Sequence, residues 1–463
     1  MTLRDKMKSE LENKNDFELA KELAYDYIDN VESMDVFPSK DSLRNLKNFD
    51  ENLPDEPTSA NEILIQLHKY GAPATTAHIG GRYFGFVDGG AIPASLAVKW
   101  LSDVWDQCGG LFNTSPINSK MEEVCESWLK DIFKLPQNTV AGFVSGTSAA
   151  NLCAVAAARY HILNKNGWNL NKRGLNGSPK IRLIAHEQTH ASIKRTLSIL
   201  GYGSDNVEWI PSDSEGRLVM ERLPKLDGNC IIFLQAGNAN SGSFDNFDKV
   251  CDLANKVGAW VHIDGAFGLW AAASESLRHL TTGIEKASSW AVDGHKTLNT
   301  PYDCGIVLCR EPKSLITAMQ ATGEYLVYSE HKDPILYTTE MSKRSRAIEL
   351  WSVMKYLGKN GIDELITTFH TRAKQLEKGL KKIGYNIVND VVFNQVMVSI
   401  YDEESTKKVT AYIQNSGVAW LGGSTWNGRA VIRISVCSWM TSEKDISTTI
   451  ELFDKAKSEI TKT

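Results

Sequence analysis

A lysine in a turn, with an aspartate and a histidine just before it, is the first candidate for chemistry in this chain. The run Asp293-Gly294-His295-Lys296 follows a strand-like stretch, and Pro301 prevents a helix from continuing past it. An amine held near cationic or desolvating neighbours loses its proton readily and can form a Schiff base with an aldehyde. The same turn could equally be a solvated loop, so its meaning depends on what lies upstream.

Three polar motifs upstream each follow a predicted strand. Ser145-Gly146-Thr147-Ser148 opens an alanine-rich helix, where free N–H groups and the helix dipole would suit a phosphate, although Ser and Thr are also ordinary helix caps. His190 could stack on a planar ring or handle protons, or it could be a capping or buried histidine. Asp264 ends an apolar strand, where a carboxylate needs a cation such as a protonated pyridine nitrogen; a structural salt bridge is the alternative.

These motifs need a scaffold that brings strand ends together. From about residue 119 to 310 helical patterns alternate with short β-rich runs, which favours an α/β fold with a mainly parallel sheet and helices on both faces. In such sheets ligands bind outside the carboxyl ends of the strands. The predicted strands are 139–144, 181–185, 230–234, 259–263 and 306–309, and the predicted helices are 93–105, 121–133, 149–163, 191–200, 246–257 and 342–358.

The rest of the chain suggests three parts. The first 70 or so residues are charge-rich and helical in pattern, and such an arm buries little by itself. We expect an N-terminal helical arm or dimerisation segment over 1–85, a large domain carrying the four motifs over 86–345, and a small C-terminal α+β domain over 346–463.

Composition excludes several classes of protein. The 463 residues are 42% apolar and 23% charged, with a net charge of −5 and no long basic run, so we expect no nucleic-acid or membrane partner. The apolar runs are too short to span a bilayer, and the first residues have no export signal. Eight cysteines without a C-x-x-C pair indicate reduced thiols, neither a disulfide framework nor a metal site. We expect a cytoplasmic enzyme.

Together, a phosphate cradle, a ring-facing histidine, a pyridine-pairing aspartate and a Schiff-base lysine describe a pyridoxal 5'-phosphate (PLP) site. The sequence resembles the group II PLP-dependent amino-acid decarboxylases, which have fold type I (aspartate aminotransferase-like). The resemblance covers about residues 60–440. It depends on Ser145-Gly146-Thr147-Ser148, Thr189-His190-Ala191-Ser192, Ser243-Phe244-Asp245, His262-Ile263-Asp264-Gly265-Ala266 and Asp293-Gly294-His295-Lys296.

The resemblance implies a mainly parallel, mixed seven-stranded sheet flanked by helices, and a role for each motif residue. Lys296 would carry the cofactor and return a proton, Asp264 would hold the pyridine nitrogen protonated, and His190 and Ala266 would lie on opposite faces of the ring. Residues implied around the phosphate and the adjoining loop are Gly146, Thr147, Ser148, His295 and Asn238, with Asp245 beneath the cofactor.

Two features depart from the family. Many aromatic decarboxylases have Asn-Pro-His-Lys where this chain has Asp293-Gly294-His295-Lys296. The family's mobile loop carries a proton-donating tyrosine, and the corresponding region 324–342 is shorter here, with Tyr337 as the first candidate and Tyr328 as the second. A lost or displaced tyrosine would favour oxidative or transamination side chemistry.

The resemblance also implies a substrate and an assembly. Phe86 and Phe112 would lie near the substrate, Phe112 in the neighbouring subunit's site, and Arg433 could pair with a carboxylate or lie on a strand surface. We therefore expect a homodimer with shared sites. The expected reaction is decarboxylation of an L-amino acid to the amine, with an aromatic amino acid as a candidate substrate. The alternatives are an aldehyde synthase, an aminotransferase, a carbon–carbon lyase or a catalytically silent PLP-binding protein.

Overall fold

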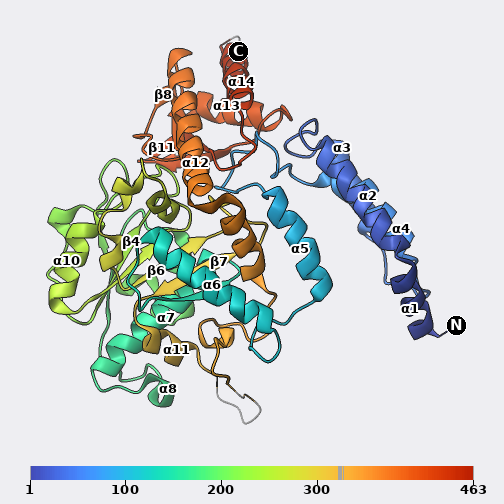
Figure 1. The fold of residues 1–463 in the computed structure, drawn as a ribbon. Coiled ribbons are helices and arrows are strands. Elements are labelled where there is room, and N and C mark those ends of the chain that lie inside the picture. The colour runs from blue at the N-terminus through green and yellow to red at the C-terminus, as the bar shows by residue number, and fades with distance from the viewer. Residues whose placement is uncertain (1, 322–325, 327, 462–463) are drawn as a thin grey trace.

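A seven-stranded mixed sheet forms the centre of the larger body in the computed structural model, which describes residues 2–321, 326 and 328–461 (Figure 1). The strand order is β1-β7-β6-β5-β4-β2-β3; β7 runs antiparallel to both its neighbours, and the other pairs are parallel. The predicted α/β fold with a mainly parallel seven-stranded sheet is confirmed. The strands are β1 (Val140–Val144), β2 (Arg182–His186), β3 (Val207–Ile210), β4 (Cys230–Gln235), β5 (Trp260–Asp264), β6 (Ser289–Asp293) and β7 (Gly305–Cys309).

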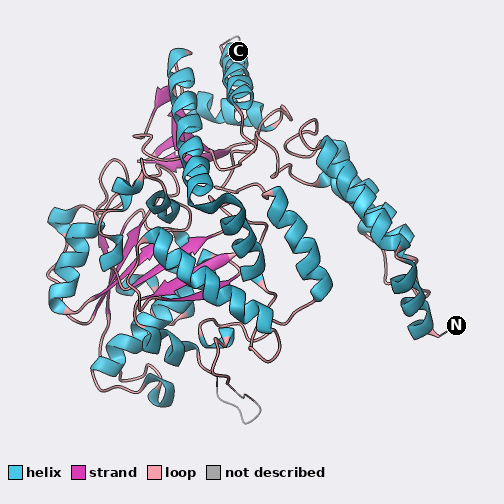
Figure 2. Ribbon diagram, viewed as in Figure 1, coloured by secondary structure: helices cyan, strands magenta, loops and turns pink. Residues whose placement is uncertain are grey.

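Helices cover both faces of this sheet (Figure 2). In β4 the side chains of Ile231 and Phe233 enter one apolar core, and those of Ile232 and Leu234 enter the other. Because both faces are buried, central strands such as β4 and β7 are nearly continuous apolar runs without polar alternation. The first core contains α7 (Thr147–Lys165), α9 (Ala191–Ile199) and α11 (Pro312–Met319); the second contains α6 (Pro116–Phe133), α10 (Phe247–Val257) and the start of α12 (Arg346–Lys382).

Helix α12 joins the large body to a smaller one. It bends at Gly358, whose φ of +59° favours glycine. Residues up to Ile366 pack into the core of the large body, and those from Phe369 onward pack into the small one. The small body has an antiparallel sheet in the order β10-β11-β9-β8, with β8 (Asn386–Ile387), β9 (Gln395–Ser399), β10 (Gly422–Trp426), β11 (Arg429–Ser435), α13 (Glu403–Gln414) and α14 (Glu443–Ile460).

The N-terminal helices project from the body as an arm (Figure 1). None of the arm helices has a buried residue, as expected for a segment that packs little on its own chain. The next helix, α5 (Pro93–Trp105), coincides with the prediction for 93–105 and packs against α12. The arm consists of α1 (Leu3–Asn13), α2 (Asn15–Asn30), α3 (Lys40–Asn45) and α4 (Ala60–Gln66).

Candidate active site

The loops after β1, β2, β4, β5 and β6 surround one cavity of about 480 Å³. These strands run in the same direction, so their carboxyl ends meet at one edge of the sheet, where open α/β sheets bind ligands. The volume suits a small molecule. Its polar and aromatic lining includes Phe86, Asp88, Ser145, Gly146, Thr147, Ser148, His190, Gln235, Asp264, Asp293, His295, Lys296, Tyr302 and Arg433.

Lys296 reaches into this cavity from the turn after β6. Its Nζ lies 3.2 Å from Oδ2 of Asp293, and its side chain is 21% exposed. Burial disfavours the ammonium, but the carboxylates of Asp293 and Asp264 outweigh that effect and raise the pKa of Lys296 above its ordinary value. An amine in this setting is held as a cation, so it must lose a proton before it can attack an aldehyde.

The turn between β1 and α7 forms an anion cup. Helix α7 begins at Thr147 after the cap residue Gly146, which has no side chain to satisfy the first amides. The Thr147 hydroxyl is buried and has no hydrogen-bond partner among the described residues. A Cβ on Gly305 in β7 would come within 2.3 Å of the Gly146 Cα, so glycine at 305 permits this close approach. The Thr147 amide N–H donates to Oδ1 of Asp293 at 2.7 Å, so the donor left without a partner at this helix N-terminus is the Thr147 hydroxyl, which is suited to a phosphate.

Asp264 is supported by a directional chain of buried hydrogen bonds. The Trp260 indole donates to the Ser289 hydroxyl at 2.9 Å, so the hydroxyl proton is free to go to Nδ1 of His262 at 2.9 Å. His262 then carries its proton on Nε2 and donates to Oδ1 of Asn151 at 2.8 Å, and Nδ2 of Asn151 donates to Asp264 at 3.1 Å. Burial lowers the pKa of His262 to about 4, which keeps this ring neutral. Every donor in the chain points toward the carboxylate, which fixes its position with directed hydrogen bonds.

His190 lies at the start of α9 with its ring open to the cavity. Its Nδ1 accepts the Ser192 amide N–H at 3.2 Å and lies 2.9 Å from the Ser192 hydroxyl, which also donates to Asp264 at 3.2 Å. Partial removal from water lowers the pKa of His190, so the ring is neutral near pH 7. Ala266, two residues after Asp264, also lines the cavity and is small enough to leave space for a flat ring.

His295 is also fixed in one tautomer. Its Nδ1 accepts the Cys304 amide N–H at 3.0 Å, so Nε2 carries the proton and points toward Asp293, 3.6 Å away. Burial lowers the pKa of His295. Tyr302 stacks on this ring with centroids 4.3 Å apart, and its hydroxyl donates to Asp88 at 2.7 Å. Burial and Asp88 raise the pKa of Tyr302, so the phenol stays protonated.

Two residues face the cavity from the side of the small body. Arg433 in β11 donates to the Ala239 carbonyl at 3.0 Å, and its guanidinium lies 5.9 Å from the centre of the Phe86 ring. Burial lowers the pKa of Arg433, but a guanidinium stays charged at any physiological pH. Phe86 is 63% exposed and stacks on Trp420. A cation beside an exposed aromatic ring can bind a carboxylate on an organic ligand.

The pyridoxal-dependent decarboxylase conserved domain matches residues 43–400. The chain belongs to this family. It is a group II PLP-dependent decarboxylase, a carboxy-lyase whose cofactor is pyridoxal 5'-phosphate, as the motifs predicted.

Individual relatives agree with this assignment. An aromatic-L-amino-acid decarboxylase of Catharanthus roseus is 24% identical over 94% of this chain and 92% of its own length. A phenylacetaldehyde synthase of a Rosa hybrid cultivar is 25% identical over 91% of this chain and 89% of its own. The crystal structure of Oryza sativa TDC with PLP and tryptamine shares the fold, with a TM-score of 0.88, 23% identity and 98% coverage of both chains.

The cavity fits the family's cofactor in its donors. The unpartnered Thr147 hydroxyl at the positive end of α7 would hold the phosphate, Asp264 would hold the ring nitrogen, and His190 and Ala266 would lie beside the ring. Among the described residues no group of three or more His, Cys, Asp or Glu side chains could hold a metal ion. Within the same part of the chain, no helix is long and apolar enough to cross a bilayer.

Four residues assigned from the resemblance do not line the cavity. Asn238 accepts the Asn240 and Ser241 amides and closes its own turn. Asp245 accepts the amides of Leu218 and Gln235, which is a structural role. Phe112 stacks on His331 with centroids 4.1 Å apart, and its assignment to the neighbouring subunit's site stays a prediction. Tyr337 is the fourth.

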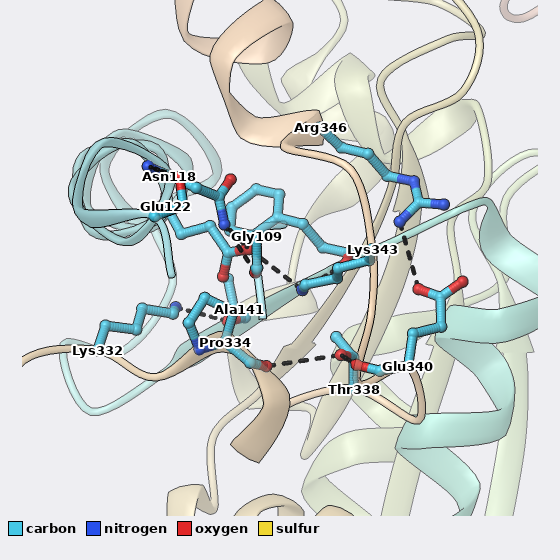
Figure 3. Close-up of polar contacts among 12 residues, drawn as sticks. Gly109, Asn118, Glu122, Ala141, Lys332, Pro334, Thr338, Glu340, Lys343 and Arg346 are labelled. Atoms are coloured by element: carbon cyan, nitrogen blue, oxygen red, sulfur yellow. Dashed lines mark hydrogen bonds and ion pairs between the residues drawn. The ribbon is translucent and has the colours of Figure 1, made fainter. Parts of the chain in front are cut away.

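Tyr337 packs beside Gly142 on the edge strand β1. Its segment carries two buried lysines, Lys332 and Lys343, which Figure 3 shows. Lys332 donates to the Ala141 carbonyl and to Glu126, both at 2.7 Å, and its Nζ lies 4.5 Å from the centre of the Tyr337 ring. Lys343 donates to the Phe143 carbonyl at 3.1 Å and pairs with Glu122 at 3.2 Å. The two lysines thus donate to carbonyls on the open edge of β1 and hold residues 332–343 against the sheet.

Only part of the rest of region 324–342, which was predicted to form the mobile loop, is described by the structure. Glu324 and Tyr325 lie outside the described residues. The hydroxyl of Tyr328 donates to the Ala321 carbonyl at 2.7 Å, and Tyr328 does not line the cavity. The tyrosine that does line the cavity is Tyr302, six residues after the lysine, which sequence reasoning missed together with Asp88 and Asn151. The position of Tyr302 directly after Pro301 in the lysine turn was a signal available in the sequence.

Proposed function

We propose that this enzyme decarboxylates an L-amino acid to the corresponding amine, with Lys296 as the residue that bonds to the cofactor aldehyde. The observation that supports this best is the placement of the Lys296 amine in one cavity with Asp264 and the Thr147 cup. When bound, the protonated pyridine ring accepts the electrons released as carbon dioxide leaves. The chain's part is to orient the substrate and to move protons.

Each neighbouring residue has a defined part in this proposal. Asp264, supported by Asn151 and Ser192, keeps a proton on the ring nitrogen. The Arg433 guanidinium binds the substrate carboxylate and sets the direction in which it departs. The ammonium form of Lys296, which Asp293 and Asp264 favour, would be the group that donates a proton to the reacting carbon.

The proposed substrate has a bulky, aromatic side chain. Phe86 lines the cavity and is exposed, and it stacks on Trp420 with ring centroids 5.7 Å apart, so it offers an aromatic surface to a ligand. The relative from Catharanthus roseus is named for aromatic substrates. A panel of amino acids assayed for carbon dioxide release would identify the substrate, and a preference for small aliphatic side chains would contradict this part of the proposal.

A second candidate is a decarboxylation-dependent aldehyde synthase. It is favoured by the placement of Tyr337 on the sheet edge, because a site without the loop tyrosine protonates the reacting carbon less efficiently. The Rosa relative is named an aldehyde synthase. The products separate the two reactions, since a decarboxylase gives the amine, whereas the oxidative reaction consumes oxygen and gives aldehyde, ammonia and peroxide.

We further propose a cytoplasmic homodimer. The arm and α5 carry exposed apolar side chains, with Val104 75% exposed and Leu101 55% exposed, and such clusters mark protein interfaces. Seven of the eight cysteines are buried and none is in a disulfide, which supports a reducing compartment. Light scattering of the purified protein should give twice the chain mass, and a monomer at micromolar concentration would exclude the shared-site arrangement.

The assignment of Lys296 is tested by borohydride reduction. Reduction of the PLP-loaded enzyme should add one cofactor mass to the peptide that contains Lys296. The Lys296→Ala variant should lose at least about a thousandfold in turnover. Lys286 on the surface, paired with Asp248 and Asp252, is the matched control, and its alanine variant should keep full activity. Labelling of another lysine would refute the assignment.

A further inference from the structure

The carboxylate of Asp293 accepts a hydrogen bond from the Thr147 amide, a donor of the anion cup that would otherwise be available to a phosphate. Its Oδ1 accepts the Thr147 N–H at 2.7 Å, and its Oδ2 lies 3.2 Å from the Lys296 amine. The side chain is 2% exposed. This residue is the first of the lysine motif and stands where many family members have asparagine.

The position of Asp293 is fixed by its backbone. It is the last residue of β6, its N–H donates to the Ala266 carbonyl at 2.9 Å, and its carbonyl accepts the Trp270 indole N–H at 2.8 Å. Only rotation of the side chain could therefore remove the carboxylate from the cup. Because the cap residue Gly146 offers no side chain, Asp293 supplies the missing helix cap from another strand.

We propose that Asp293 is an internal anion that competes with the cofactor phosphate for the Thr147 amide and thereby weakens cofactor binding. A phosphate that accepts a hydrogen bond from the Thr147 amide would bring its negative charge next to the Asp293 carboxylate. Like charges in close contact repel strongly in a buried site. The carboxylate must turn away as the phosphate enters. An asparagine at the same place has the same shape and can keep the cap, but it carries no charge.

A second consequence concerns Lys296. Asp293 is the strongest of the carboxylates that hold the lysine as a cation. Removal of its charge should therefore also make the amine more available to any aldehyde. The phosphate effect and the amine effect can be separated, because pyridoxal has the aldehyde without the phosphate and inorganic phosphate has the anion without the aldehyde.

The test measures binding of three probes to the cofactor-stripped enzyme and to Asp293→Asn. We expect the Kd of PLP to fall at least about tenfold in the variant, the Kd of pyridoxal to fall less, and inorganic phosphate to raise the melting temperature of the variant more than that of the wild type. Asp293→Ser, which is also uncharged, should show the same order of effects if the asparagine variant folds poorly. Asp88→Asn removes another cavity carboxylate that is not on the Thr147 amide, and it should not produce the phosphate-specific gain.

The inference rests on the family's use of PLP, and its failure is distinguishable from a failure of the proposed function. Equal or weaker PLP binding by both uncharged variants would overturn the role of Asp293 while leaving a functional decarboxylase. Equal gains for PLP and pyridoxal would also overturn it, since only the amine would then have changed. Failure of the wild type to bind PLP at all would instead remove the proposed function.

Discussion

Replacement of Asn151 by alanine tests whether the buried chain behind Asp264 matters for catalysis. Asn151 has no exposed surface, and it is the link that donates directly to the carboxylate. A hydrogen bond to a charged group contributes about 1.5–3 kcal/mol, so its loss should weaken the support of the Asp264 carboxylate by that amount. Because a tenfold change corresponds to about 1.4 kcal/mol, turnover should fall between about tenfold and a hundredfold.

The Asn151→Ala substitution should also lower the free energy of unfolding. Without the Asn151 carbonyl, the Nε2–H of His262 loses its acceptor at a site with no exposure to water. A buried donor without a partner costs about 1–3 kcal/mol, so urea denaturation should show a loss of that size. Asn166 at the end of the same helix, which donates to Asn229 near the surface, is the control, and its alanine variant should keep wild-type turnover.

The assay is steady-state turnover with saturating PLP, together with the absorbance titration of the bound cofactor. A merely structural role for Asn151 would lower stability and leave both turnover and the titration of folded enzyme unchanged. Turnover within threefold of wild type at full cofactor loading would therefore refute the directional chain as a support for Asp264.

The remaining predictions concern Arg433 and His262. Arg433→Gln should lower kcat/KM about tenfold to a hundredfold through loss of a charge-assisted bond, while inhibition by the amine product, which has no carboxylate, should stay unchanged; weaker amine binding would contradict carboxylate recognition. His262 has a pKa of about 4 in the folded protein against 6.5 ordinarily, so the unfolded chain binds its proton first as pH falls. The neutral His262 ring therefore contributes up to about 3 kcal/mol to the free energy of unfolding; this contribution is present in full above pH 6.5 and is lost as the pH falls toward 4. His262→Gln should flatten that part of a urea stability profile, and an unchanged acid slope would refute the neutral buried ring.

The residues that sequence reasoning placed well are those held by local geometry. Asp264 is the last residue of β5, and Thr147, His190 and Lys296 lie in the turns just after β1, β2 and β6. Parallel strands bring their carboxyl ends together whatever the details of packing. Their shared cavity therefore follows from strand order. The strand at 207–210 was missed because it is only four residues long and half-exposed in its middle, so it shows no strong apolar run.

The residues that were missed depend on contacts across long separations in the chain. Asn151 looks like any polar residue on an alanine-rich helix until His262, 111 positions away, is brought against it. Asp88 comes from a loop near the N-terminal arm and meets Tyr302 across 214 positions. No periodicity or motif encodes such pairs, because each partner has an unremarkable neighbourhood in the sequence.

Tyr337 shows why loop function is harder to predict than a strand-end motif. A tyrosine in the right interval of sequence can act on a substrate only if its segment is free to reach the cavity. Here that segment carries Lys332 and Lys343, whose ammonium groups are buried against Glu126 and Glu122. Freeing the segment would strand charged groups that are nearly inaccessible to water, at a cost of about 3–5 kcal/mol for each broken pair. The ion pairs of Lys332 and Lys343 thus oppose movement of Tyr337 into the cavity. We therefore expect Lys296, rather than Tyr337, to donate the proton to the reacting carbon.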